Sequence, residues 1–173
     1  MIARARVLLL ALPMLVACSD DASSDATGPV DRTGTVVFSD MMVLYGSLRT
    51  TSGLTTVTKD VVKDDAAWSA RWRTITAGIN AGASDFTTAP PVAFTKDMVL
   101  VYGAGQRPTG GYAATIDTVY ALSDGIEVVV TNNAPGADCV NTTALTAPMA
   151  MVRVARKDGR VVWREKERTV DCR

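Results

Sequence analysis

The sequence predicts a mainly β fold of the α+β class: an antiparallel sheet or sandwich with one packed helix. Three observations lead to this prediction. Short β-branched and apolar runs recur along the chain between turns that contain glycine. A segment around residue 70 has helical periodicity instead. The order of the elements shows neither a strand–helix–strand rhythm nor an internal repeat, which disfavours a parallel sheet.

The start of the chain is typical of a secretory signal peptide. Arg4 and Arg6 supply positive charge, and the apolar run 7–17 is too short for a bilayer core of ~30 Å, which needs roughly 20 residues. The run ends in Leu-Val-Ala-Cys, which resembles the bacterial lipobox, where the cysteine thiol takes a diacylglycerol. We therefore expect residues 1–17 to be a lipoprotein signal peptide and Cys18 to carry lipid. A plain secreted protein, cut near residue 17, is the alternative.

The expected lipid fixes the expected location. Cys18 with two or more acyl chains, such as palmitate, would hold the chain on a membrane of the bacterial cell envelope, at the periplasmic or extracellular face. Residues 18–33 are polar and acidic and contain glycine and proline, so we expect a disordered tether. As a flexible coil the tether would reach about 20 Å on average. Residues 34–173 are then the globular domain.

The first half of this domain contains three expected strands and the helix. The strands are the β-prone runs 35–38, 41–45 and 55–62. Asp64 or Asp65 can cap a helix that stops near Gly78. Trp68, Trp72 and Ile75 have the spacing i, i+4 and i+7 and share one face of that helix. An aromatic stripe of this kind indicates core packing rather than a ligand site.

The second half contains further strands and three loops. We expect strands at 92–94, 98–102, 112–122 and 126–130, with loops at 80–91, 103–111 and 132–141. The runs 149–155 and 160–164 are expected to form a last hairpin, because Lys157-Asp158-Gly159 carries an Asp-Gly turn signal. The mixed charges of 164–168 are expected to be exposed.

Composition excludes several classes of function. The chain has no histidine, which excludes Ser-His-Asp and Cys-His catalysis and imidazole zinc sites. Loss of the leader removes two arginines, so the mature chain carries 16 basic and 18 acidic residues, a net charge of −2 without a basic field for nucleic acid. We expect no enzymatic activity, no metal and no small-molecule cofactor. A hydrolase that uses carboxylates such as Asp97 and Asp117 is the weakest alternative.

The other two cysteines are Cys139 and Cys172, an even pair once Cys18 is lipidated. In an oxidising envelope such a pair predicts a disulfide, which would tie the 132–141 loop to the C-terminal tail. Closing a loop of about 33 residues contributes ~3–4 kcal/mol in the chain-entropy model. A reactive or metal-binding thiol is disfavoured, because no histidine and no C-x-x-C spacing accompany either sulfur.

The most distinctive segment is GAGQRPTGGY at 103–112, with four glycines and a proline in ten residues. Glycines permit positive φ and close backbone approach, so a compact loop can present Arg107, Thr109 and Tyr112. The alternative is an ordinary strand connection whose Tyr112 lies in the core. A G-x-G-x-x-G phosphate site is excluded by the glycine spacing and by the lack of a following helix.

With this loop and the segments around it, the chain resembles the C-terminal domain of the PrcB family, which is named for a subunit that supports a secreted protease complex. The resemblance covers roughly 68–154. It rests on VAFTKDMVL at 92–100, where Ala93 replaces the usual acid, on GQRPTGGY at 105–112, and on the later TAP and MVRV segments at 146–148 and 151–154. The resemblance implies a non-enzymatic domain that binds or stabilises a protein partner, such as an exported protease.

The candidate partner-binding residues are those of the glycine-rich loop, because arginine and tyrosine are suited to anchoring an interface. They are Arg107, Pro108, Thr109, Gly110, Gly111 and Tyr112. The loop is also similar to the Thr-Gly-aromatic loop of chagasin-like cysteine-protease inhibitors, which sit on an immunoglobulin-like sandwich. This similarity implies the alternative function, a protease inhibitor whose loop plugs an active-site cleft.

Overall fold

The computed structural model describes residues 30–77, 79 and 86–172. The expected signal peptide, Cys18 and most of the expected tether therefore lie outside the described residues. Across the ranges that are described, no helix combines the length and the apolar character needed to cross a membrane.

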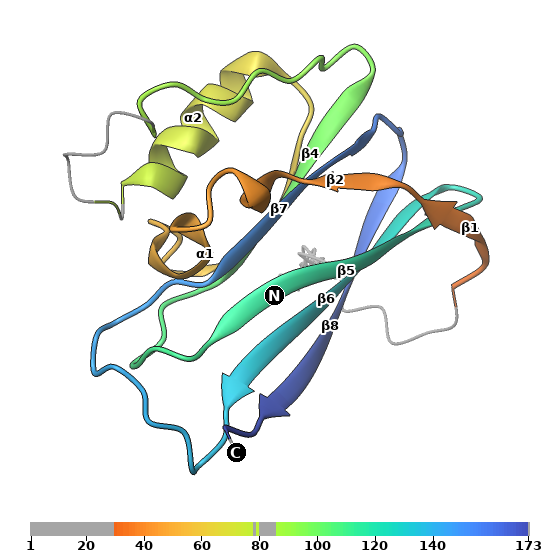
Figure 1. Cartoon of the computed structure of the whole chain (residues 1–173). Coiled ribbons are helices and arrows are strands. Elements are labelled where there is room, and N and C mark those ends of the chain that lie inside the picture. Colours follow the sequence, from red (N-terminus) through yellow and green to blue (C-terminus); the bar gives the residue numbers. More distant parts are fainter. Residues whose placement is uncertain (1–29, 78, 80–85, 173) are drawn as a thin grey trace, which may run out of the picture.

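In the described residues, eight strands form two four-stranded sheets, as Figure 1 shows. Sheet A has the order β1 (Arg32–Val36), β5 (Ala113–Leu122), β6 (Gly125–Pro135), β8 (Arg160–Val170). Sheet B has the order β2 (Phe38–Asp40), β7 (Met149–Ala155), β4 (Asp97–Ala104), β3 (Val57–Val62). The helical segments are η1 (Met41–Val43), α1 (Leu48–Thr51) and α2 (Asp65–Thr76). The expected mainly β sandwich is confirmed.

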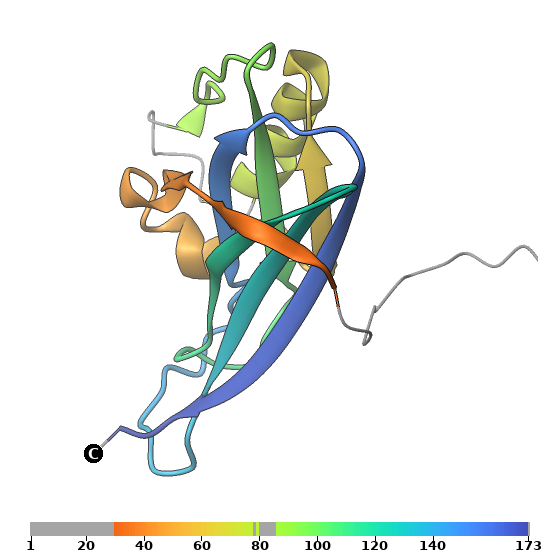
Figure 2. The same ribbon diagram turned by 90° about the vertical axis from the view of Figure 1, so that its right-hand side faces the viewer.

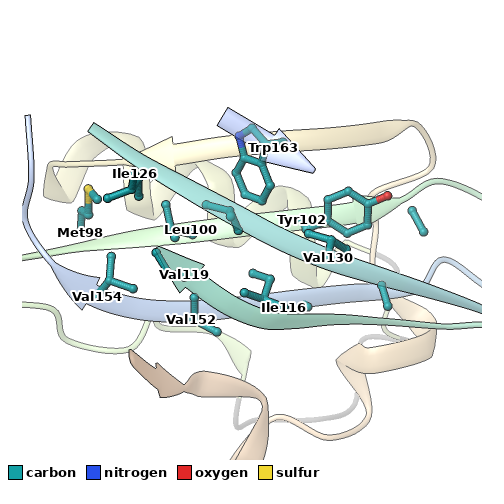
Figure 3. Packing of buried hydrophobic residues seen from close by; sticks show 14 residues of the cluster. Met98, Leu100, Tyr102, Ile116, Val119, Ile126, Val130, Val152, Val154 and Trp163 are labelled. Atoms are coloured by element: carbon teal, nitrogen blue, oxygen red, sulfur yellow. The ribbon is translucent and has the colours of Figure 1, made fainter. Parts of the chain in front are cut away.

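Two apolar clusters lie on opposite faces of sheet B, which makes a three-layer arrangement. One cluster fills the space between the sheets, and Figure 3 shows Met98, Leu100 and Val152 of sheet B against Ile116 and Val130 of sheet A. The other lies between sheet B and the helices, which cover its outer side. Because alternate residues of a strand point to opposite faces, β4 and β7 contribute to both clusters.

Helix α2 forms as the sequence predicts. The side chain of Asp64 caps it by accepting a hydrogen bond of 2.8 Å from the backbone N–H of Ala67. Trp68, Trp72 and Ile75 are buried against sheet B. Each indole N–H also has a partner, since Trp68 donates to a backbone carbonyl at 2.8 Å and Trp72 to another at 2.9 Å. The stripe is therefore core, as expected.

The expected strand at 41–45 is wrong, because the chain turns there into η1. The carboxylate of Asp40 accepts a 2.8 Å hydrogen bond from the N–H of Met42 and so starts the helical turn. Met42 is buried, whereas Val43 and Leu44 are 74% and 82% exposed. An apolar run alone does not distinguish a strand from a short helical turn. The run 92–94 is likewise not a strand.

The expected last hairpin is also wrong. β7 belongs to sheet B, whereas β8 crosses to sheet A and pairs with β6 in parallel, so sheet A is mixed. The connection turns at Gly159, whose φ is +106°, and a Cβ there would lie 2.1 Å from the carbonyl oxygen of Asp124. The Asp-Gly signal thus marks a turn between sheets.

Two boundaries differ from the expectation. β6 continues to Pro135, so 132–135 is strand rather than loop. β1 begins at Arg32, two residues before the expected start of the domain. Arg32 is held in the fold because its guanidinium bonds Glu127 of β6 at 2.5 Å.

Candidate functional site

The glycine-rich segment forms a loop, residues 105–112, between β4 and β5, and we name it the TGGY loop. Its backbone is held on two sides. Gln106 N–H donates to the carbonyl of Thr55 at 2.9 Å, and Gly110 N–H donates to that of Thr142 at 3.0 Å. Arg107 and Thr146 exchange two backbone hydrogen bonds of 2.7 and 3.0 Å. The loop is therefore built into the end of the sandwich.

The glycines serve this backbone packing, as the sequence predicts. Gly105 and Gly111 have φ of +76° and +83°, a region that favours glycine. A Cβ on Gly111 would lie 2.3 Å from the side-chain oxygen of Asn141, and one on Gly110 would lie 2.5 Å from the hydroxyl of Thr142. Both glycines thus allow a second loop to approach closely.

That second loop, residues 136–148, joins β6 to β7 and lies beside the end of β8, as Figure 2 shows. The Cys139–Cys172 disulfide is present and ties the loop to the chain beyond β8, with a Cα–Cα distance of 5.0 Å. Gly136 N–H adds a 2.9 Å hydrogen bond to the carbonyl of Val170. The loop exposes Val140 fully and Leu145 by 65%. The disulfide therefore holds the segment that in turn holds the TGGY loop.

The side chains of the TGGY loop are partly accessible. Pro108 is exposed, and Arg107, Thr109 and Tyr112 are half-buried. The guanidinium of Arg107 lies 5.6 Å from the centre of the Tyr112 ring, within the range of a cation–π contact. Tyr112 belongs to neither apolar cluster, so it does not serve as a core residue.

Behind the loop, a polar network closes the same end of the sandwich. The hydroxyl of Tyr102 donates to Glu165, and Lys59 bonds the other oxygen of Glu165 at 2.5 Å. The amide nitrogen of Asn132 donates to the Tyr102 oxygen at 2.8 Å and to Glu167 at 2.9 Å. Figure 3 shows the Tyr102 hydroxyl pointing away from the aliphatic cluster.

Burial and hydrogen bonding shift the pKa values of two groups in the network. Burial, together with the bond to Glu165, raises the pKa of Tyr102. Burial also raises the pKa of Glu165, but bonds from Lys59 and Tyr102 outweigh it and leave that pKa below its usual range. Near neutral pH the network therefore holds a neutral phenol against an ionised carboxylate.

A cavity of about 90 Å³ lies between the TGGY loop and the network. Arg107 and Tyr112 line it from the loop, and Asn132, Asn133 and Glu167 line it from the sheet. Asn132 is only 4% exposed. Within the described part of the chain, the side-chain oxygens of Asn132 and Asn133 are buried without a hydrogen-bond partner.

The sequence did not predict this cavity. The sequence predicts a loop at Asn132 and an exposed charge run at 164–168, whereas the side chains of Arg164 and Glu165 are only 29% and 28% exposed. The sequence signal that points to these residues is the alternation of Trp163, Glu165 and Glu167, which places all three on one face of a strand.

The structure does not bring the two candidate carboxylates together. Asp97 begins β4 in sheet B, 3.8 Å from Arg153, whereas Asp117 lies on β5 in sheet A and accepts a hydrogen bond from Thr131. Among residues 30–77, 79 and 86–172, no three cysteine, aspartate or glutamate side chains are grouped to hold a metal ion.

The fold and the two clamped loops define a class of protein, a small β-sandwich domain with a helical layer and a loop-built end. Residues 98–155 match the family model described as PrcB C-terminal, which confirms the resemblance to that family over this part of the chain. The match runs from β4 to the end of β7 and includes both loops. It is narrower than the resemblance at 68–154. No curated protein matches the chain, and neither does any solved structure.

Proposed function

We propose that this chain is a membrane-tethered extracytoplasmic lipoprotein whose domain binds or stabilises a protein partner, an exported protease in the first instance. The family match supports a PrcB-like, protease-associated role. The observation that carries the proposal is the fixed backbone of the TGGY loop, which offers Arg107, Pro108 and Tyr112 at one end of the domain. A loop ordered before binding loses little entropy when a partner docks. The proposed role needs no chemical step from this chain.

The loop is tested by co-purification of the tagged full chain from the envelope of the cells that produce it. Arg107→Ala and Tyr112→Ala should each reduce recovery of an exported protease about tenfold or more, because arginine and tyrosine are frequent interface anchors. Gln106→Ala is the matched control, since Gln106 is exposed in the same loop and offers only its backbone to the fold. Equal recovery with all three variants would refute the role of the loop.

The tether is tested separately by labelling with radioactive palmitate. The label should be incorporated into the full chain and lost in Cys18→Ser, because the thiol is the proposed attachment point. The same variant should move from the membrane fraction to the soluble envelope fraction, since lipid chains supply the anchoring free energy. An unlabelled wild-type chain that stays in the cytosol would overturn both the anchor and the location.

A protease inhibitor is the second candidate. The observation in its favour is that Pro108 and Gly111 are exposed at the tip of a loop whose two flanks are clamped, a shape that can enter a cleft. Titration of the purified chain against a papain-like protease tests this function. Absence of inhibition at micromolar concentrations would eliminate it and leave the binding role as it stands.

A further inference from the structure

The cavity behind the TGGY loop contains a buried hydrogen-bond acceptor that has no donor in the described part of the chain. The side-chain oxygen of Asn132, which shares the inner face of β6 with Val128 and Val130, is buried and has no partner within the described residues. The amide orientation of Asn132 is fixed, because its nitrogen already donates to Tyr102 and Glu167. Buried acceptors without a donor are disfavoured, so each such group calls for an explanation.

The carboxylate of Glu167 gives the cavity a preference in charge. Glu167 lies on an exposed stretch of β8 and also lines the cavity, which places it at the rim. It accepts a hydrogen bond from Asn132, and a carboxylate offers about four acceptor positions. A positively charged donor is therefore favoured over a neutral one of the same size.

The size of the cavity further limits which groups can occupy it. A volume of about 90 Å³ suits a slim group such as an ammonium on a short alkyl chain. The apolar wall formed by Ala104 and Pro148 suits the methylenes of such a chain. Arg107 also lines the cavity. Its guanidinium lies over the Tyr112 ring, so an entering cation can occupy the cavity without displacing the Arg107 side chain.

We propose that this cavity binds a primary ammonium group, supplied by a lysine side chain or an amino terminus of the protein partner. The inference rests on the proposed function for the identity of the partner. The ammonium donates to the side-chain oxygen of Asn132 and pairs with Glu167 at the rim. Water is the competing occupant, since the cavity is lined by polar groups and is large enough for several water molecules.

The test is an NMR titration of the full mature chain with small probes that need no partner. N-acetyl-lysine methylamide supplies a side-chain ammonium, glycine methylamide supplies an amino terminus, and N-acetyl-norleucine methylamide is the neutral control. The ammonium probes should shift the side-chain amide signals of Asn132 in a saturable way. The probe that binds more tightly identifies which source of ammonium the cavity prefers.

Variants connect the shifts to the cavity. Glu167→Gln and Asn132→Ala should each weaken binding of the preferred probe at least about fivefold, because the first removes the charge that pairs with the ammonium and the second removes the buried acceptor. Asp158→Asn is the matched control, since it removes the same charge from an exposed turn outside the cavity. If one variant fails to fold, as judged by signal dispersion, the other still decides the outcome.

Arg107→Ala separates this inference from the proposed function. It should reduce recovery of the protein partner yet leave binding of the small ammonium probe unchanged or stronger, because it removes a nearby positive charge. No saturable shift at about 20 mM probe, where a millimolar site is filled, would overturn the ammonium site. Equal shifts with the norleucine probe would overturn it as well. Neither result would bear on partner capture by the loop.

Discussion

Two polar clusters of sheet A differ in how completely their hydrogen bonds are satisfied. On the outer face, the side chain of Glu127 is fully buried, and both its oxygens are bonded at 2.5 Å, one by Arg32 and one by Arg164. At the end of the sandwich, Asn132 is 4% exposed, and its oxygen lacks a partner within the described residues. We call the Glu127 cluster closed, because both carboxylate oxygens have partners, and the Asn132 cluster open, because its amide oxygen has none among the described residues.

The difference teaches where stability and binding reside in this domain. The closed cluster joins β1, β6 and β8 of one sheet, because Arg164 reaches Glu127 from the neighbouring β8 and Arg32 reaches it from β1 across β5. Arg32 also lies 4.1 Å from the centre of the Tyr120 ring. Both oxygens of Glu127 have an arginine partner and its side chain is not exposed, so a ligand has no access to this cluster. The open cluster adjoins a cavity and a presented loop. The predictions below separate the two clusters by their effects on unfolding and on binding.

The largest expected effect is loss of the disulfide. Cys139→Ser with Cys172→Ser should lower the free energy of unfolding by about 3–4 kcal/mol, because a closed loop of 33 residues restricts the unfolded chain. Urea denaturation measures this change. The freed 136–148 loop also holds the TGGY loop, so exchange of the Gly110 amide should accelerate more than that of amides around Glu127. Equal acceleration at both places would contradict a coupling confined to the open end.

The next effect concerns the closed cluster. Glu127→Gln keeps the shape of the side chain but removes the charge from two charge-assisted hydrogen bonds. We expect a loss of about 2 kcal/mol in the free energy of unfolding, since hydrogen bonds to charged groups contribute roughly 1.5–3 kcal/mol each and both arginines regain some hydration. Binding of an ammonium probe at the open cluster should not change. A variant as stable as the wild type would show that the cluster contributes little.

The same cluster predicts a pH dependence. The hydrogen bond from Arg32, and then that from Arg164, outweigh burial and hold the pKa of Glu127 below its usual range. A lowered pKa in the folded state means that the contribution is complete above the unfolded pKa of about 4.3 and is lost as the pH falls through the folded value. The stability difference between wild type and Glu127→Gln should thus be constant from pH 7 to about 5 and shrink below 4. A difference unchanged at pH 3 would contradict it.

The sequence predicts those parts of the fold whose signals are local. Trp68 and Trp72 identify α2 by their spacing, and the alternation in β5 identifies a strand with one buried face. The partner of β8 could not be predicted, because an Asp-Gly turn specifies local backbone geometry but not the sheet that the chain enters next. The strand predicted at 41–45 is wrong, because capping by Asp40 starts a helical turn in residues that β propensity alone would place in a strand.

The candidate site likewise has a part that local sequence signals predict and a part that they do not. Glycines at 105, 110 and 111 predicted a compact loop with close backbone approach, and the structure confirms both features. The cavity depends on long-range neighbours, since Asn132 meets Tyr102 and Glu167 from strands 30 and 35 residues away along the chain. Polar residue type placed Asn132 in a loop, whereas tertiary pairing with β5 and β8 places it in a strand.

The smallest effect on stability is expected where the effect on binding is large. Glu167→Gln should change the free energy of unfolding by less than about 0.5 kcal/mol, because Glu167 is exposed and a glutamine oxygen can still accept the bond from Asn132. Urea denaturation beside the ammonium titration measures both quantities on one variant. Glu127→Gln is the reverse control, with lower stability and intact binding. If Glu167→Gln also lowered stability by about 2 kcal/mol, the open cluster would be as structural as the closed one, and the contrast between them would fail.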